Sequence, residues 1–208
     1  MLTLQVALTF FAASIALALA PGPDNIFVLT QSSLSGRKAG ILITLGLCTG
    51  ILVHSSAVAL GVAVFFQRSR AAFFILKSLG ACYLGYLAFQ AFRAADAELS
   101  SGTAVDAAPF KLYCRGIIMN VTNPKVSIFF LAFLPQFADP QRGSVPVQLM
   151  MLGSLFILAT ILIFSAIALL AGTLGQWLNR SRIAQKVMHR VAGTVFACIA
   201  VKLATAVR

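Results

Sequence analysis

Residues 14–28 read SIALALAPGPDNIFV, an apolar run whose polar interruption consists of Pro21, Gly22, Pro23, Asp24 and Asn25. A proline inside a helix removes one backbone hydrogen-bond donor and clashes with the preceding turn. We therefore expect the apolar segment from Thr3 to Ser35 to form a helix that is broken near its middle into two half-helices.

The composition of the whole chain indicates whether this segment lies in water or in a membrane. Of the 208 residues, 60% are hydrophobic and 10% are charged, and the mean hydropathy is +0.94. Soluble domains carry about 25% charged residues, so this chain could not cover its surface in water. The 17 Phe residues and the long aliphatic runs exclude a disordered chain. Because strand-like alternation is absent, we expect an all-α integral membrane protein.

A second apolar segment, from Leu112 to Phe137, carries an interruption of the same kind, made of Asn123, Pro124 and Lys125. A break inside a bilayer frees backbone groups that lipid cannot satisfy, so protein or a water-filled cavity must supply their partners. The half-helix after each break presents unpaired N–H groups and a partial positive charge, which suit a carboxylate. Asn followed by Pro has the form of an N-cap with Pro at the first helical position. We expect a similar helix start at Pro23 or Asp24.

The chain offers four further segments that approach the length of a transmembrane helix, about 20 mainly apolar residues. They are Ile41 to Phe66, Ala71 to Phe92, Val147 to Ala171 and Val191 to Val207. With the two broken segments they make about six transmembrane helices. A cleaved signal peptide ending near Ala20 is an alternative for the first segment, but basic residues are missing before it and Pro21 would follow the cleavage site directly.

The basic residues predict the orientation of these helices. The chain has 16 Lys and Arg against 5 Asp and Glu, but they occur singly or in pairs between apolar runs, so we expect no nucleic-acid partner. One set follows the first, third and fifth spans: Arg37, Lys38, Arg93, Lys111, Arg115, Arg180, Arg182, Lys186 and Arg190. The opposite set consists of Arg68, Arg70, Arg142 and Arg208. The positive-inside rule places the larger set in the cytoplasm and both termini outside.

A polar linker divides the chain into two halves. Residues 94–111 carry Asp96, Glu98 and Asp106 and separate a three-helix unit, 1–93, from a second unit, 112–208. An odd number of crossings makes the second half enter from the opposite side, so the halves are expected to be inverted repeats within one membrane domain. Interrupted helices at matching positions of two halves point to the binding site of a transporter.

Asp24 is the only acidic residue inside a predicted span. A charge there costs at least about 2.5 to 3.5 kcal/mol, so something must offset it. The functional interpretation is that Asp24 meets a substrate ammonium, a coupling proton or Lys125. The alternative is an N-cap that accepts backbone N–H bonds.

Two other positions in the predicted spans have two interpretations each. Lys125 could pair with Asp24 or attract a substrate carboxylate, or it could extend to the cytoplasmic interface. His54 lies mid-span and could relay protons or hydrogen-bond a neighbouring helix. Gly46 and Gly50 form a small-xxx-small pair that is typical of close helix packing.

The sequence carries no enzyme constellation. The metalloprotease, nucleophile-elbow and phosphate-loop motifs are missing, and paired carboxylates are not available. Cys48, Cys82, Cys114 and Cys198 fall singly inside apolar segments, so neither a disulfide framework nor a zinc site is expected. We expect no enzyme activity and no cofactor.

Several motifs together resemble the LysE/RhtB family of bacterial amino-acid exporters. They are PGPDN at 21–25, GRKAG at 36–40, Gly46 and Gly50 leading to His54, LGA at 79–81 with Tyr83 and Leu84, and NPK at 123–125 running into Phe129 and LPQF at 134–137. Ala88 stands where the family commonly has glycine. The last third of the chain matches only in hydropathy.

The resemblance implies a multi-pass protein of the bacterial inner membrane that exports an amino acid or derivative by using the ion gradient. It also implies that Asp24 with its flanking prolines, and Asn123 with Pro124 and Lys125, line the pathway. A single acid in the membrane favours neutral amino acids over lysine or arginine. An ion or solute channel and a membrane scaffold are the competing hypotheses, and the sequence leaves open whether the chain forms a homo-oligomer.

Overall fold

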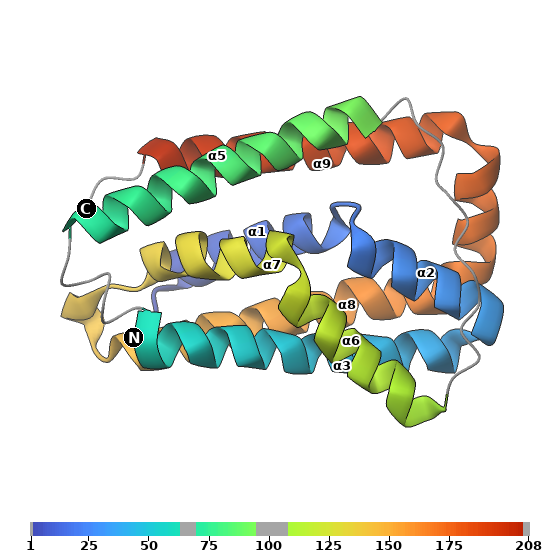
Figure 1. Cartoon of the computed structure of the whole chain (residues 1–208), viewed down its shortest axis with the longest axis horizontal. Helices are drawn as coiled ribbons and strands as arrows, with labels where there is room; N and C mark the ends of the chain where they lie inside the picture. The colour runs from blue at the N-terminus through green and yellow to red at the C-terminus, as the bar shows by residue number, and fades with distance from the viewer. Residues whose placement is uncertain (1, 63–69, 95–107, 206–208) are drawn as a thin grey trace.

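A computed structural model describes residues 2–62, 70–94 and 108–205, and the regular elements in these ranges are helices that run along one long axis (Figure 1). The long helices are α1 (Leu4–Leu19), α2 (Pro23–Ser35), α3 (Arg37–Ala57), α5 (Arg70–Ala94), α6 (Pro109–Thr122), α8 (Val145–Arg180) and α9 (Arg182–Thr205). The shorter elements are the helix α7 (Pro124–Ile128), the π-helical η1 (Val58–Val62) and η2 (Phe129–Phe133), and the 3-10 turns η3 (Leu134–Phe137) and η4 (Pro140–Arg142).

Both predicted breaks are present. The chain bends by 60° between α1 and α2, and by 51° between α6 and the helical stretch that begins with α7. Each break coincides with prolines, at Pro21 and Pro23 in the first case and at Pro124 in the second. The two apolar segments are therefore bent pairs of half-helices, as the sequence predicts.

Length and hydropathy identify two unbroken helices that could cross a membrane, Arg37–Gly61 and Val145–Ala171, and up to four spans if each bent pair counts as one. The third and sixth predicted spans fall on α5 and α9, which do not pass this test over the described residues. A total of six crossings therefore stays a prediction.

The predicted span from Val147 to Ala171 agrees with the membrane-length stretch Val145–Ala171, although the helix α8 itself continues to Arg180. The last helix, α9, begins at Arg182, before the predicted start of the sixth span at Val191. A span predicted from hydropathy ends at the first charged residue. A helix can be longer than its span, because its backbone hydrogen bonds continue through polar residues. Most of the predicted linker, with Asp96, Glu98 and Asp106, lies outside the described residues.

The surface of the helix bundle is apolar and part of its interior is polar. Leu60, Ile183 and Leu4 are 83%, 77% and 75% exposed, whereas Asp24 and Lys125 are 3% and 6% exposed. This distribution reverses that of a soluble protein. It fits a bundle whose outer face contacts lipid.

Glycines bring α3 and α6 into backbone contact. A Cβ placed on Gly46 would lie 2.1 Å from the carbonyl oxygen of Tyr113, and one on Gly116 would lie 2.4 Å from that of Ile43. At Gly50 a Cβ would lie 2.7 Å from Cβ of Asn120. The packing role predicted for Gly46 and Gly50 is confirmed.

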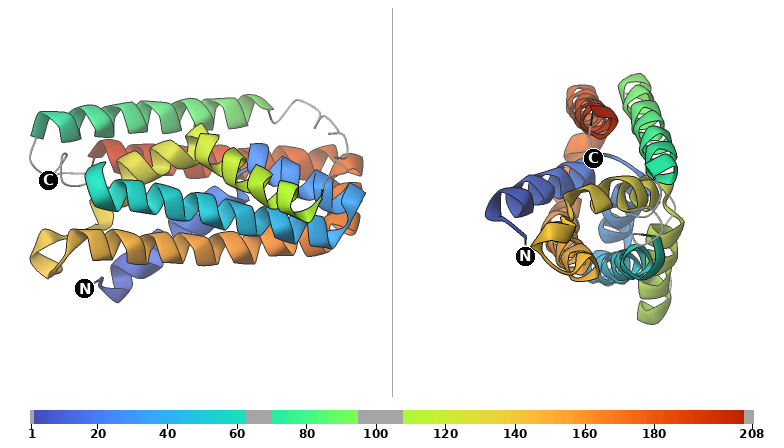
Figure 2. Two further views of the ribbon diagram at one scale, coloured as in Figure 1. Left: turned by 60° about the horizontal axis from the view of Figure 1, so that its bottom comes forward. Right: turned by 90° about the vertical axis from the view of Figure 1, so that its left-hand side faces the viewer.

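Several other contacts also join helices from the two predicted halves. α5 packs against α9, while α1, α2 and α3 all pack against α8. The views agree that α1 begins and α9 ends at one end of the bundle, whereas the α2–α3 and α8–α9 corners lie at the other (Figures 1 and 2). The basic residues at these two corners, which are predicted to be cytoplasmic, therefore belong to the same end.

Candidate functional site

The two breaks meet inside the bundle. The ammonium group of Lys125, at the second break, donates hydrogen bonds to the carbonyl oxygens of Leu17, at 3.2 Å, and Ala20, at 3.0 Å, at the end of α1. A Cβ added to Gly22 would lie 3.2 Å from the same nitrogen. Lys125 is buried, so the alternative in which it extends to the interface is wrong.

The first break follows from its sequence. α1 ends at Leu19, and Pro21 cannot continue the hydrogen-bond ladder. α2 then starts with Gly22 as N-cap and Pro23 as its first residue. The amide nitrogen of Asn25 reaches back 2.6 Å to the carbonyl oxygen of Ala18. Asn25 and Lys125 thus supply partners for the carbonyl groups that the break exposes.

The second break has the predicted cap. Oδ1 of Asn123 accepts a hydrogen bond from the backbone nitrogen of Lys125 at 3.0 Å, and Pro124 takes the first helical position of α7. Asn123 itself is 4% exposed, and its amide nitrogen has no hydrogen-bond partner within the described ranges. The cap therefore leaves one polar group of Asn123 available.

Asp24 lies in the first turn of α2 and is not its N-cap, so the alternative interpretation of this residue is wrong. Its carboxyl group is near the ammonium of Lys125 and the side chains of Asn123, Asn120 and His54. Oδ1 of Asp24 has no hydrogen-bond partner in the part of the chain that the structure describes. The carboxyl group is held near several polar groups but is not saturated by them.

Asp24 and Lys125 do not close to a salt bridge. Among the described residues, the pair within 4 Å is Arg142 and Asp139, at 3.0 Å on the surface. The ammonium of Lys125 instead donates to the carbonyl oxygens of α1. The carboxyl group of Asp24 and the amino group of Lys125 thus line one site without direct contact.

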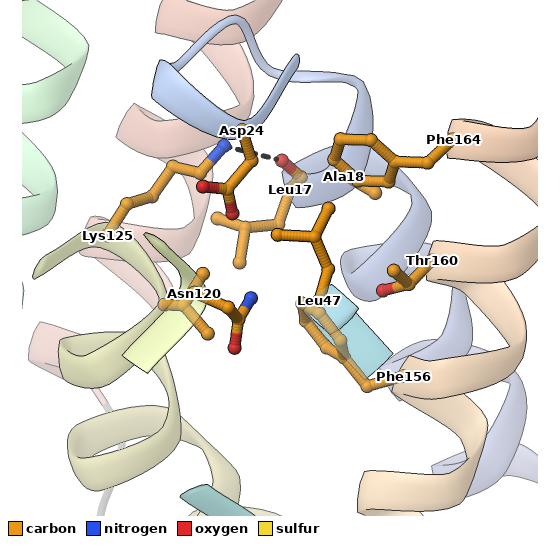
Figure 3. Close-up of a pocket in the computed structure, with 10 residues that line it drawn as sticks. Leu17, Ala18, Asp24, Leu47, Asn120, Lys125, Phe156, Thr160 and Phe164 are labelled. Atoms are coloured by element: carbon orange, nitrogen blue, oxygen red, sulfur yellow. Dashed lines mark hydrogen bonds between the residues drawn. The ribbon is translucent and has the colours of Figure 1, made fainter. Parts of the chain in front are cut away.

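A small cavity lies between these groups (Figure 3). Its polar lining comes from Asp24, Lys125, Asn120 and Thr160, and its apolar lining includes Phe156 and Phe164. Its free volume is about 10 Å³, which is room for one water molecule. α2, α6, α7 and α8 each contribute one of the polar side chains.

Sequence reasoning missed Asn120 and Thr160. They are 2% and 1% exposed, and Oδ1 of Asn120 and Oγ1 of Thr160 have no hydrogen-bond partner within residues 2–62, 70–94 and 108–205. Asn120 stands three residues before Asn123, about one helical turn from the break, and that spacing could have identified it. Thr160 is one of several hydroxyl residues in an uncharged span, and no sequence signal separates it from the others.

His54 lies beside the cavity without lining it. Its Nε2 is 3.2 Å from the backbone oxygen of Asn120, and its ring centroid is 5.6 Å from that of Phe130. The contact with a neighbouring helix is the one expected from the simpler interpretation of His54.

An aromatic cluster adjoins the cavity through Phe156. The Phe156 ring lies 5.4 Å from that of Phe129 and 5.1 Å from that of Phe130. Phe10 in turn lies 5.9 Å from Phe129 and 5.2 Å from Phe137. All of these phenylalanines except Phe137 are at most 3% exposed. The cluster thus continues from the cavity lining at Phe156 into the interior of the bundle.

The chain is similar in sequence to known proteins. Residues 15–207 match the model of the LysE type translocator family. The chain is 32% identical over 197 residues to the homoserine/homoserine lactone efflux protein of Salmonella typhimurium, covering 95% of each chain. It is 27% identical over 203 residues to an uncharacterized membrane protein of Vibrio cholerae, covering 98% of each. No solved structure matches the chain.

Proposed function

Because the chain belongs to the LysE type translocator family, we propose that it exports a small neutral amino acid or a close derivative across the bacterial inner membrane. The relatives named homoserine/homoserine lactone efflux proteins support this substrate class. The observation that carries the proposal is the buried carboxyl group of Asp24, which faces Lys125 where the two broken helices meet.

An amino acid carries its ammonium and its carboxylate on the same carbon atom, and the site offers a group of opposite sign for each. The ammonium binds Asp24, whose Oδ1 has no partner among the described residues. The carboxylate binds near Lys125 and the amide nitrogen of Asn123, which is also without a partner in the described part of the chain. Pro21, Gly22, Pro23, Asn25 and Pro124 shape the backbone around this pathway.

The substrate is neutral overall because the site balances one carboxylate with one ammonium. A cationic side chain would need a second acid in the membrane, and Asp24 is the acidic residue that lines the cavity. Lysine and arginine are therefore poor substrates in this proposal.

Transport proceeds by alternating access. The cavity has room for one water molecule, so it must open to admit an amino acid, first toward the cytoplasm and then toward the periplasm. Equivalent helices of the two halves make equivalent contacts, which supports two inverted halves. The broken pair α1 and α2 of the first half contacts α8 of the second, and α6 of the second half contacts α3 of the first. Both termini are periplasmic in this arrangement.

Proton coupling completes the proposal. A proton on Asp24 removes the charge that holds the substrate ammonium, so proton entry from the periplasm and substrate release there are linked. His54 is a second candidate for the coupling group because its ring contacts the backbone of Asn120. Asp24 is favoured because it lines the cavity and His54 does not.

Counterflow in proteoliposomes tests the exporter against its two competitors. Vesicles loaded with unlabelled homoserine are expected to accumulate labelled homoserine transiently. Flux without such exchange would identify a channel, and absence of flux would identify a scaffold.

Asp24→Asn tests the site within the same assay, with Asp139→Asn as matched control. Asp139 is an acid whose side chain is 43% exposed and pairs with Arg142 on the surface. We expect exchange to be lost in the first variant and kept in the second. Full exchange by Asp24→Asn would contradict the site assignment.

A further inference from the structure

A second apolar cluster adjoins the cavity, apart from the phenylalanine cluster. Ala18, Leu47 and Phe164 belong to this second cluster and also line the cavity. Its other buried members lie in the parts of α2, α3, α6 and α8 that approach the α2–α3 corner (Figure 1): Val28, Ala39, Ile43, Leu112 and Ala168. The second cluster therefore extends from the cavity toward the end of the bundle that is predicted to be cytoplasmic.

An aromatic ring and a guanidinium group meet at the edge of the second cluster. Phe27 packs against the cluster and is half-buried, and it stands three residues after Asp24, about one helical turn. The guanidinium carbon of Arg115 lies 4.9 Å from the centre of the Phe27 ring. Arg115 is exposed and lies about 7.5 Å along α6 from Asn120, at 1.5 Å for each residue. The contact therefore joins the half-helices α2 and α6 between the site and the predicted cytoplasmic end.

This contact is weaker than the packing beyond the second break. α2 packs mainly against α8 and α3, and α6 packs mainly against α3, so the two half-helices have little contact with each other. A cation–π pair at an exposed position contributes little. Beyond the break, by contrast, the buried rings of Phe129, Phe130 and Phe156 pack against one another. Separation of α2 from α6 therefore costs less than opening the phenylalanine cluster.

The chemistry of Arg115 suits a carboxylate better than a ring. A guanidinium group has five N–H donors, and two of them can bind both oxygens of one carboxylate. The Phe27 ring offers it no acceptor oxygen. Within the described ranges, neither Asp24 nor Asp139 forms an ion pair with Arg115. A carboxylate that arrives from water can therefore take the place of the ring as the partner of Arg115.

A carboxylate bound at Arg115 fixes the direction in which an amino acid enters. The exposed guanidinium holds the carboxylate at the outer edge of the second cluster, and the ammonium then points toward the buried Asp24. In the proposed function Asp24 binds this ammonium, and Lys125 binds the carboxylate at the deeper position. Arg115 therefore acts before the substrate reaches these two groups.

We propose that Arg115, held over Phe27, is an entry site that binds the carboxylate of the amino acid on the cytoplasmic side and turns its ammonium toward Asp24. The inference rests on the proposed function and on the orientation that belongs to it.

The test measures KM for labelled homoserine in inside-out membrane vesicles, which present the cytoplasmic face to the medium. Arg115→Gln is expected to raise KM by about fivefold, a modest factor because water screens an exposed charged contact. The maximal rate should stay unchanged, since Asp24 and Lys125 still hold the substrate after entry. Arg115→Lys should raise KM less, because lysine keeps the charge but lacks the paired donors. An unchanged KM in Arg115→Gln would overturn the entry site.

Lys111→Gln is the matched control for charge. Lys111 is also an exposed cation of α6, four residues before Arg115, so its removal changes the net charge of this end equally. We expect this variant to keep the wild-type KM. An equal rise of KM in Lys111→Gln would show a general effect of charge and would overturn the specific role of Arg115.

Phe27→Leu separates binding from packing. Leucine keeps an apolar contact with the second cluster but removes the ring under the guanidinium, so Arg115 stays available for a carboxylate. KM on the cytoplasmic face should therefore not rise. An equal rise of KM in Phe27→Leu and Arg115→Gln would show that the pair only holds α2 against α6, and it would overturn carboxylate binding.

The face of the membrane and the ionic strength give two further readings. In right-side-out vesicles, which present the periplasmic face, Arg115→Gln should keep the wild-type KM. In inside-out vesicles, added salt should raise KM of the wild type more than KM of Arg115→Gln, because salt screens an exposed charge. A rise of KM only on the periplasmic face, or equal salt dependence of both proteins, would overturn the entry site.

Failure of the entry site and failure of the proposed function give different results. Uptake of homoserine by the wild type with the same KM in Arg115→Gln would contradict the entry site alone. Absence of homoserine uptake by the wild type in both kinds of vesicle would contradict the proposed function.

Discussion

The ammonium group of Lys125 lies 3.0 Å from the carbonyl oxygen of Ala20, although 105 residues separate them in the chain. The bond joins the start of one half-helix to the end of another, and each belongs to a different predicted half. A residue that lines the cavity therefore also holds the two breaks together. Changes at Lys125 should affect both the stability of the protein and its transport.

Lys125→Met is expected to lower thermal stability strongly. The substitution keeps most of the side-chain volume but leaves the carbonyl groups of Leu17 and Ala20 without their donor, at a cost of about 1–3 kcal/mol for each buried group. Thermal unfolding in detergent measures the change. The control is Lys111→Met, at an exposed lysine near the start of α6, which should unfold like the wild type. Equal melting temperatures for the two variants would show that the bonds of Lys125 contribute little.

Gly46→Ala should destabilise the contact between α3 and α6. The new Cβ would lie 2.1 Å from the backbone oxygen of Tyr113, so the helices must separate, and overpacking of this kind costs about 1–3 kcal/mol. Gly85→Ala is the control, because nothing lies within 4 Å of its added Cβ and alanine favours a helix. The melting temperature should fall for Gly46→Ala and should stay the same or rise for Gly85→Ala. A lower melting temperature for Gly85→Ala than for Gly46→Ala would contradict the backbone contact between α3 and α6.

Phe156→Ala should widen the range of amino acids that are exported. Removing this ring enlarges the cavity and opens its contact with Phe129 and Phe130. We expect counterflow of leucine to rise relative to that of homoserine. Phe89→Ala is the control, since Phe89 is 62% exposed on α5 and should not affect selectivity. An unchanged ratio in Phe156→Ala would show that another group sets the size limit.

His54→Gln should keep proton-driven export. A glutamine amide can reach the backbone oxygen of Asn120 as the imidazole does, at 3.2 Å in the wild type, but it cannot carry a proton near neutral pH. Efflux is measured with and without an inward proton gradient, with Asp24→Asn in parallel. The expected result is stimulation by the gradient in His54→Gln and its absence in Asp24→Asn. Loss of stimulation in His54→Gln alone would make His54 the coupling group.

The backbone around the site could be predicted from the sequence because prolines dictate it locally. Pro21, Pro23 and Pro124 place both breaks, and Asn123 before a proline specifies its own cap. The burial cost of charge likewise singled out Asp24 and Lys125. These rules need no knowledge of which helices are neighbours.

The neutral polar residues of the site could not be predicted in this way. Thr44 and Thr160 both stand in apolar helices, yet one hydroxyl donates to its own helix and the other faces the cavity. Only tertiary packing separates them. The contact of Lys125 with the end of α1 could not be predicted from the sequence either. An ammonium group can donate to a carboxylate or to a carbonyl oxygen, and the sequence does not decide between them.

The size of the cavity also bears on the passage of protons. Protons cross membranes quickly along files of hydrogen-bonded water, and a space of about 10 Å³ that abuts the Phe156, Phe129 and Phe130 rings is too small for such a file. In this conformation the cavity by itself therefore gives protons no path across the protein.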